Sequence, residues 1–192
     1  MKIGLIRHGK TEWNALGKIQ GQTDIPLNEE GLTQARLLAD RLVRENERWD
    51  AVVTSDLSRA AETGRIVAEA IGVPLLPGEP LLRERSFGLI EGTTEAERIE
   101  TWGADWRSSS KAGVESDASV QDRAAAFLAK WRNNMPEANL LVVSHGSYLA
   151  QMLALMCEHL DNSYIGNMSF SVLEFKDNRW DPVLHNCTLH LQ

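Results

Sequence analysis

Near its N-terminus the chain reads Ile-Gly-Leu-Ile-Arg-His over residues 3–8, an apolar run that ends in two basic side chains. A short run without polar residues is typical of a strand that is buried on both faces. Two similar runs occur at residues 51–53 (Ala-Val-Val) and 140–143 (Leu-Leu-Val-Val), and amphipathic stretches separate the runs. This alternation predicts an α/β fold, a three-layer α/β/α sandwich around a mostly parallel central sheet.

The amphipathic stretches predict three helices, over about residues 28–48, 56–71 and 146–158. Asn28 is a good N-cap for the first helix, and Gly72 is placed to end the second. We expect the first to bury a face made of the following residues: Leu32, Ala35, Ala39, Leu42 and Val43.

The C-terminal part of the chain predicts a hairpin of residues 169–175 and 179–184, with Pro182 placing the second strand at a sheet edge. Residues 93–119 are polar and form the least regular segment, which predicts a lid-like excursion over the sheet. We find neither an internal repeat nor a long linker, so residues 1–192 are predicted to form a single domain.

The composition narrows the class of function. The chain of 192 residues has a formal net charge of −7, which argues against general binding to nucleic acids or anionic membranes. A small anionic substrate remains compatible with this charge if arginines gather locally. Apolar runs are too short for a membrane span or a signal peptide, and the two cysteines, Cys157 and Cys187, cannot form a disulfide framework. We therefore expect a cytoplasmic protein.

Basic side chains follow each of the predicted parallel strands. Arg7 and His8 follow the first strand, Arg59 lies in the first helical turn after the second, and His145 and Gly146 follow the third. Because the carboxyl ends of parallel strands meet at one edge of a sheet, these residues are predicted to form one site.

These residue types suit phosphoryl transfer. Arginine forks match the non-bridging oxygens of a phosphoryl group, and the helix N-terminus at Gly146 adds N–H donors. Neighbouring cations disfavour protonation of His8, and a neutral imidazole is nucleophilic. A carboxylic acid is needed to protonate the leaving alkoxide, but residue type alone does not identify it among 27 acidic residues.

The sequence resembles the histidine phosphatase superfamily, whose fold is that of cofactor-dependent phosphoglycerate mutases. The resemblance rests on motifs in the family's order, and residues 186–191 (NCTLHL) are similar to its last strand. The motifs are residues 5–14 (LIRHGKTEWN), 20–27 (QGQTDIPL), 54–63 (TSDLSRAAET), 82–88 (LRERSFG), 91–92 (EG) and 143–146 (VSHG).

The resemblance implies a role for individual residues. His8 would accept the phosphoryl group covalently, and Glu84 would act first as the general acid and then as the base that activates water. No metal ion or other cofactor is implied. The remaining residues that it implies, for binding the phosphoryl group and the substrate, are Arg7, Arg59, His145, Asn14, Gln20 and Gly21.

Other residues have more ordinary interpretations. Lys10 replaces the glutamate or glutamine more usual in the family, and it either adds charge at the site rim or points to solvent. Trp102 and Trp106 either anchor the excursion in the core or line an apolar substrate pocket. We expect structural or surface roles for His159, His185 and His190, and we interpret Arg83 and Arg85, which flank Glu84, as solvated surface charge.

The family contains phosphatases and phosphoglycerate mutases. Mutases that resemble this chain carry a long insertion with a basic cluster between the equivalents of Glu84 and His145. Here Arg98, Arg107 and Lys111 of this segment are scattered, and any of them could meet a substrate anion. A short excursion leaves water access, so we predict a phosphomonoesterase that hydrolyses small phosphorylated metabolites. The alternatives are a phosphoglycerate mutase and a non-catalytic phospho-ligand-binding protein. The natural substrate and the oligomeric state stay open.

Overall fold

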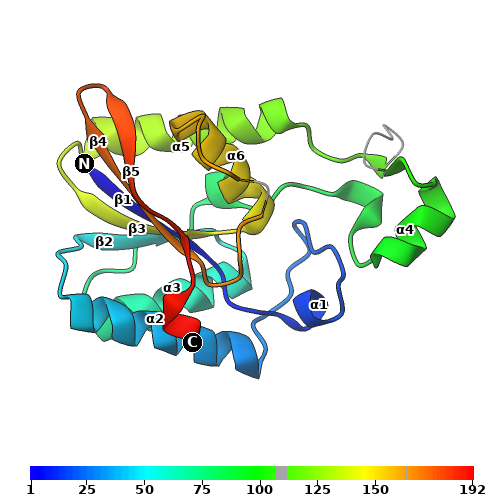
Figure 1. Ribbon diagram of the computed structural model, residues 1–192, viewed down its shortest axis with the longest axis horizontal. Helices are drawn as coiled ribbons and strands as arrows, with labels where there is room; N and C mark the ends of the chain where they lie inside the picture. Colours follow the sequence, from blue (N-terminus) through cyan, green and yellow to red (C-terminus); the bar gives the residue numbers. More distant parts are fainter. Residues whose placement is uncertain (107–111, 163) are drawn as a thin grey trace.

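A single mixed sheet forms the centre of the protein, in a computed structural model that describes residues 1–106, 112–162 and 164–192. Its strands follow one another in the order β2-β3-β1-β4-β5 (Figure 1). The strands are β1 (Lys2–Arg7), β2 (Ala51–Thr54), β3 (Asn139–Ser144), β4 (Phe170–Lys176) and β5 (Arg179–Cys187).

The direction of the strands agrees with the predicted mostly parallel sheet. β1 and β2 both pair in parallel with β3, while β4 runs antiparallel to β1 and β5 antiparallel to β4. All strands except β4 therefore point the same way. The tight turn that reverses the chain contains Asp177 and Asn178, which have φ angles of 50° and 61°. Pro182 lies in the edge strand β5, as predicted.

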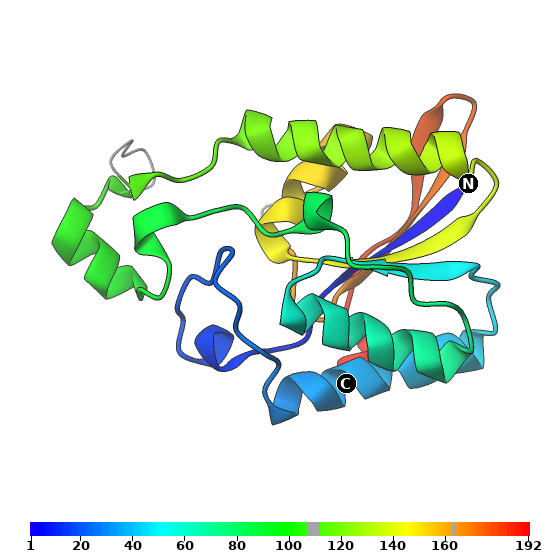
Figure 2. The same ribbon diagram turned by 180° about the vertical axis from the view of Figure 1, so that it is seen from behind.

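Helices cover both faces of the sheet, which confirms the three-layer sandwich (Figure 2). α2 and α3 pack with Val52, Leu141 and Val143 on one face, while α5 and α6 pack with Leu140 and Val142 on the other. The α-helices are α1 (Glu12–Ala15), α2 (Glu29–Glu45), α3 (Ser58–Ile71), α4 (Glu95–Trp102), α5 (Asp117–Asn134) and α6 (Gly146–Met156). Short 3-10 helices cover Pro80–Leu82, Gly88–Ile90 and Leu189–Leu191.

The structure confirms the predicted start of α2 and the predicted end of α3. The Asn28 carboxamide oxygen accepts the N–H of Gly31 and caps α2, and Gly72 ends α3 with a φ angle of 71°. Two buried positions of α2 were not in the predicted face, Gly31 and Leu38, whereas Val43 is exposed. The last segment differs as well, because β5 ends at Cys187 and a 3-10 helix follows in place of a strand.

The predicted irregular excursion is partly helical, and this part of the prediction is wrong. Residues Glu95–Trp102 form α4, which projects beyond the sandwich (Figure 1), and residue 117 already belongs to α5. A capping box between Thr94 and Glu97 starts α4. A small hydrophobic cluster of Ile90, Trp106 and Ala112 holds the excursion together. Its function as a lid and the single-domain assignment of residues 1–192 remain predictions.

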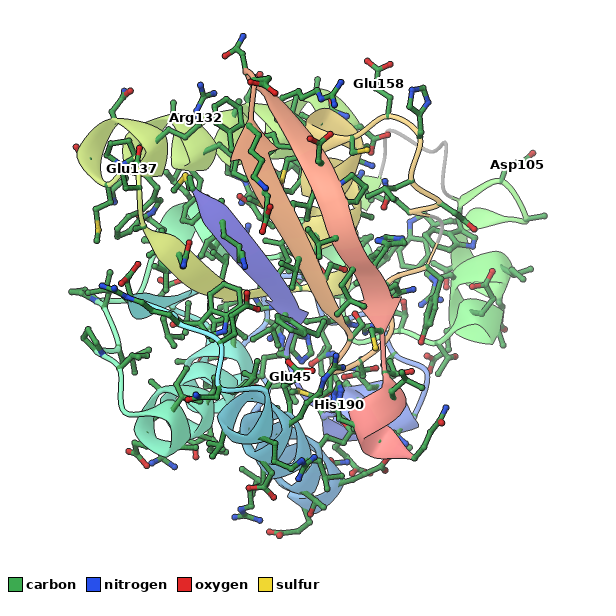
Figure 3. The ribbon with its side chains drawn as sticks, turned by 60° about the vertical axis from the view of Figure 1, so that its left-hand side comes forward. Glu45, Asp105, Arg132, Glu137, Glu158 and His190 are labelled. Atoms are coloured by element: carbon green, nitrogen blue, oxygen red, sulfur yellow. The ribbon has the colours of Figure 1, made fainter. Side chains whose placement is uncertain are left out.

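Histidines outside the predicted site lie at the surface or at the edge of the core. His159 is exposed, and the Nε2 of His185 is 2.8 Å from the carbonyl oxygen of Asp161. His190 is buried in the C-terminal 3-10 helix and lies near Glu45 of α2 (Figure 3). Among the described helices, none is both long and apolar enough to cross a membrane.

Candidate active site

The carboxyl ends of the three parallel strands meet as predicted. The N–H of His8, just after β1, donates to the carbonyl of Ser144 at the end of β3, with an N···O distance of 3.0 Å. The N–H of Ser55, just after β2, donates to Val143 of the same strand at 2.9 Å. Loops that are far apart in sequence thus form one continuous edge that carries the predicted side chains.

The His8 ring is held in one orientation and in its neutral form. Its Nδ1 lies 2.7 Å from the carbonyl oxygen of Gly9, which can only accept, so Nδ1 carries the proton. This tautomer leaves the lone pair on Nε2. Burial lowers the pKa of His8 well below its usual value, and the positive charges of Arg59 and Arg7 lower it further. A neutral imidazole with a free Nε2 is the nucleophilic form.

His145 lies beside His8 at the start of α6. The two ring centroids are 5.1 Å apart, and Nε2 of His145 is 2.9 Å from the hydroxyl oxygen of Ser55. Burial, followed by the charge of Arg59, lowers the pKa of His145 well below its usual value. Its Nδ1 is buried and has no hydrogen-bond partner among the described residues. The hydrogen-bonding capacity of that nitrogen is therefore unsatisfied within the described part of the chain.

Arg7 and Arg59 supply the positive charge of the site. Arg7 ends β1 and donates through Nη1 to the carbonyl of Ile165. Arg59 lies in the first turn of α3 and is fully buried, and burial lowers the pKa of both guanidinium groups, which still remain cations. The Nε atom of each is buried without a partner among the described residues, although a buried charged donor requires one.

A loop around Gly21 orients Arg59. Arg59 donates through Nη2 to the carbonyl of Gly21 at 2.7 Å and through Nη1 to that of Thr23 at 2.9 Å. Glu91 holds this loop because its carboxylate accepts the N–H groups of Gln22 and Thr23 at 3.1 and 2.9 Å. Gly21 has a φ angle of 56°, and a Cβ there would lie 2.0 Å from Glu91. A side chain at this position would therefore be strained and would displace Glu91.

Glu84 is joined to the same edge of the sheet through backbone N–H groups. Its carboxylate accepts those of Arg85 and Tyr148 at 2.8 Å each and that of Ser147 at 3.1 Å. Ser147 and Tyr148 belong to the first turn of α6, where a negative charge is stabilised. The sequence predicts that this helix end binds phosphate, whereas two of its N–H groups bind Glu84.

A cavity of about 720 Å³ lies in front of these groups. Arg7, His8 and Glu84 line it, while Arg59 and His145 lie behind this surface. The four residues predicted for substrate binding also line it: Asn14, Gln20, Gly21 and Gly146. Asn14 is oriented by Thr11, whose N–H donates to its carboxamide oxygen at 3.1 Å. The structure thus brings together all the predicted site residues.

Other cavity residues carry no sequence signal that singles them out. They include Lys18, Gln151, Asn162 and Tyr164, while Arg98 was named from the sequence only as one of several scattered basic residues. Their positions in loops and helix faces, without a common spacing, hide them from sequence analysis. Ser55 and Thr63, which bind His145 and the N–H of Gly9, do lie within the quoted motif of residues 54–63 and could have been found there.

The structure decides between the two roles that the sequence left open for Lys10, and it bears on those left open for Trp102 and Trp106. Lys10 forms an exposed ion pair with Glu30 of α2 at 2.8 Å, so it does not line the cavity. Trp106 both lines the cavity and packs in the excursion's own small cluster, against which Trp102 is partly buried, so neither anchors the excursion in the main core. Arg107 and Lys111 lie outside the described residues.

The interpretation of the two arginines beside Glu84 needs correction. Arg83 is an exposed surface charge as expected, although it pairs with Asp56 at 2.6 Å. The Arg85 side chain is only 12% exposed and pairs with Asp117. It also donates to the hydroxyl of Ser147 at 2.9 Å, so the prediction of a solvated Arg85 is wrong.

The geometry and the motifs agree with a comparison against protein families. The model of the histidine phosphatase superfamily (branch 1) matches residues 3–188. This chain belongs to the histidine phosphatase superfamily. The resemblance seen in the sequence is therefore confirmed over nearly its whole length.

Several named relatives of this histidine phosphatase are similar over most of their length. The uncharacterised phosphatase PhoE of Bacillus subtilis (strain 168) is 32% identical, covering 98% of this chain and 96% of the relative. A metal-independent phosphoserine phosphatase of Arabidopsis thaliana is 34% identical, with coverages of 93% and 78%. A probable phosphoglycerate mutase, GpmB, of Yersinia pestis (strain Pestoides F) is 29% identical, with coverages of 94% and 87%.

Solved structures show the same fold. A mycobacterial glucosyl-3-phosphoglycerate phosphatase in complex with VO3 is 28% identical, with a TM-score of 0.82, covering 97% of this chain and 98% of that one. A mutant phosphoserine phosphatase of Entamoeba histolytica in complex with phosphoserine is also 28% identical, with a TM-score of 0.79 and coverages of 100% and 99%.

The neutral buried histidines of this histidine phosphatase predict a stability that falls in mild acid. Because the folded pKa values of His8 and His145 are lowered, the unfolded chain binds more protons once the pH drops below about 6.5. Each histidine then removes up to about 1.4 kcal/mol of the free energy of unfolding per pH unit. Urea unfolding at pH 7.5 and 5.5 measures this loss. Replacing His145 by glutamine should reduce it, while replacing the exposed His159 should not; equal losses in all three proteins contradict the prediction.

Proposed function

We propose that this chain is a phosphomonoesterase that hydrolyses small phosphorylated metabolites through a phosphohistidine on His8. The observation that carries the proposal is the His8 ring, whose Nδ1 is bound to the Gly9 carbonyl while the ring lines the cavity. Nε2 attacks phosphorus and forms a P–N bond as the bond to the ester oxygen breaks. Water then attacks the phosphohistidine, and the P–N bond breaks to release inorganic phosphate.

The transferred phosphoryl group is bound by Arg7, Arg59 and His145. Each of the three has a buried nitrogen without a protein partner among the described residues. These nitrogens come from the ends of different strands and surround His8, so they can donate to the non-bridging oxygens. Asn14, Gln20, Gly21 and Gly146 line the same cavity and are the proposed substrate contacts.

Glu84 is the proposed proton donor and acceptor. Protonated, it gives its proton to the leaving alkoxide, and the resulting carboxylate then takes a proton from the attacking water. Its contacts with Ser147 and Tyr148 place it at the same helix end that His145 caps, and it lines the cavity with His8. These positions support the assignment over the other acidic residues of the chain.

The alternatives are less well supported. The relatives of 32% and 34% identity and both solved structures named above are phosphatases, while probable phosphoglycerate mutases of Yersinia match at 29% identity. A protein that only binds a phospho-ligand has no use for a neutral, oriented histidine that lines the same cavity as a carboxylate. Relatives act on or bind phosphoserine and a glucosylated phosphoglycerate by name, so we propose small phosphorylated acids and sugars as the first substrates to examine. A cytoplasmic location also remains our proposal.

Product analysis separates hydrolysis from mutase activity. With 3-phosphoglycerate, with and without its bisphosphate, we expect release of inorganic phosphate to exceed formation of 2-phosphoglycerate. The physical reason is that the open cavity admits water to the phosphohistidine.

Activity should also survive EDTA, because every protein group in the proposed steps is an amino-acid side chain. Isomerisation that exceeds phosphate release would assign the mutase instead, and strict loss of activity with EDTA would refute the metal-free mechanism.

A further inference from the structure

The guanidinium group of Arg123 connects α5 to the segment that carries Glu84. Through Nη1 it donates to the carbonyls of Leu81 and Arg83, at 2.9 Å each. Through Nε and Nη2 it donates to both carboxylate oxygens of Glu115, at 2.9 and 3.0 Å. The fork of arginine makes such two-sided contacts with a defined geometry, which a lysine cannot reproduce.

Glu115 holds the other side of the same segment. Its Oε2 accepts the N–H of Ser86 at 3.0 Å, and its backbone carbonyl accepts Nη1 of Arg85 at 3.1 Å. Burial raises the pKa of Glu115, but hydrogen bonds from Arg123, Ser86 and Ser119 outweigh this and lower it. The side chain therefore remains ionised at neutral pH and keeps its ion pair with Arg123.

The backbone is thus bound on both the N-terminal and the C-terminal side of Glu84. Backbone groups of residues 81, 83 and 86 are bound by Arg123 or Glu115, and Glu84 lies between them. Arg123 also lies over the Tyr148 ring, 5.2 Å from its centroid, and the N–H of Tyr148 binds the Glu84 carboxylate. The Arg123 and Glu115 side chains are only 20% and 13% exposed, so solvent screens the pair less than an ordinary surface ion pair.

We propose that Arg123 and Glu115 are positioning residues that place Glu84 for proton transfer. The inference rests on the proposed function, in which Glu84 is the general acid. Proton donation requires heavy atoms within about 2.6 to 3.2 Å, and a misplacement of about 1 Å can cost about 100-fold in rate. Neither Arg123 nor Glu115 lines the cavity, so each acts through Glu84 and not on the substrate.

The test uses two substrates that differ in their need for an acid. The p-nitrophenolate ion leaves readily without a proton, whereas the serine alkoxide of phosphoserine does not. In Arg123→Met, we expect kcat/KM for phosphoserine to fall at least about 10-fold more than kcat/KM for p-nitrophenyl phosphate. Arg123→Lys keeps the charge but loses the fork, so its effect should be in the same direction and smaller.

Arg132→Met is the matched control on the same helix. Arg132 packs over the Phe175 ring, 4.0 Å from its centroid, on the side of α5 toward the β4–β5 hairpin (Figure 3). It forms no hydrogen bond or ion pair with residues 81–86 among the described residues, so its ratio of the two kcat/KM values should equal that of the wild type. If Arg123→Met does not fold, Glu115→Gln, which keeps the shape of the side chain, gives the same comparison.

The outcomes separate the positioning role from the proposed function. In a Glu84→Gln background, adding Arg123→Met should not change the ratio further, because both act through the same carboxylate. A folded Arg123→Met protein that is slowed equally on both substrates overturns the positioning role alone. An unchanged ratio in Glu84→Gln itself overturns the acid role of Glu84, and the positioning role with it.

Discussion

Replacing His8 by alanine is expected to abolish phosphomonoester hydrolysis, with kcat reduced by up to about 10⁶-fold. The neutral ring is the protein's only nucleophile in the proposed steps, and alanine leaves Arg7, Arg59 and His145 without a group that can accept the phosphoryl moiety. These residues would still bind phosphate. We therefore expect the inactive variant still to bind inorganic phosphate tightly, in competition with the substrate.

A covalent label distinguishes loss of the nucleophile from a general defect. Wild-type protein quenched during turnover of a ³²P-labelled substrate should carry acid-labile, base-stable label, as a P–N bond requires, and His8→Ala should carry none. His159→Ala is the matched control, because His159 is exposed and outside the site. Label that persists in His8→Ala would assign the nucleophile to another residue.

Replacing Glu84 by glutamine should slow alkyl phosphates by about 10²- to 10⁴-fold and aryl phosphates much less. Glutamine cannot donate the proton of a carboxylic acid, and only poor leaving groups depend on that proton. Glutamine also offers one acceptor oxygen where the carboxylate offers two, so the three N–H groups of Arg85, Ser147 and Tyr148 cannot all remain bound as before.

Rates with p-nitrophenyl phosphate and phosphoserine measure this difference directly. Glu62→Gln is a suitable control, because Glu62 pairs with Arg65 at the surface of α3 and lies outside the cavity lining. We expect its two rates to match those of the wild type. Equal slowing of both substrates in Glu84→Gln would instead indicate a role in binding or stability.

The elements that sequence analysis predicted are those with a local signal. Buried parallel strands carry an apolar run, as the buried residues of β3 from Leu140 to Val143 show. Asn28 and Gly72 mark helix ends through their own hydrogen bond or backbone conformation. α5 was not predicted, although its buried residues Val120, Ala124, Phe127 and Leu128 repeat with helical spacing.

For the site, the sequence alone determined which residues meet. Parallel strands bring their carboxyl ends to one edge, so Arg7, His8, Arg59 and His145 had to converge whatever the details of packing. The family motifs added Glu84, Asn14 and the turn at Gly21. All of these assignments depend on the order and the type of the residues, and the sequence itself contains both.

Only the tertiary structure decided how these residues are held. The Gly9 carbonyl selects the tautomer of His8, the N–H groups of α6 bind Glu84, and Arg123 with Glu115 binds the segment around it. Each of these interactions joins a side chain to a backbone group or a partner whose position depends on the path of another segment. Hydrogen bonds depend on distance and angle within tenths of an ångström, and a sequence pattern contains neither.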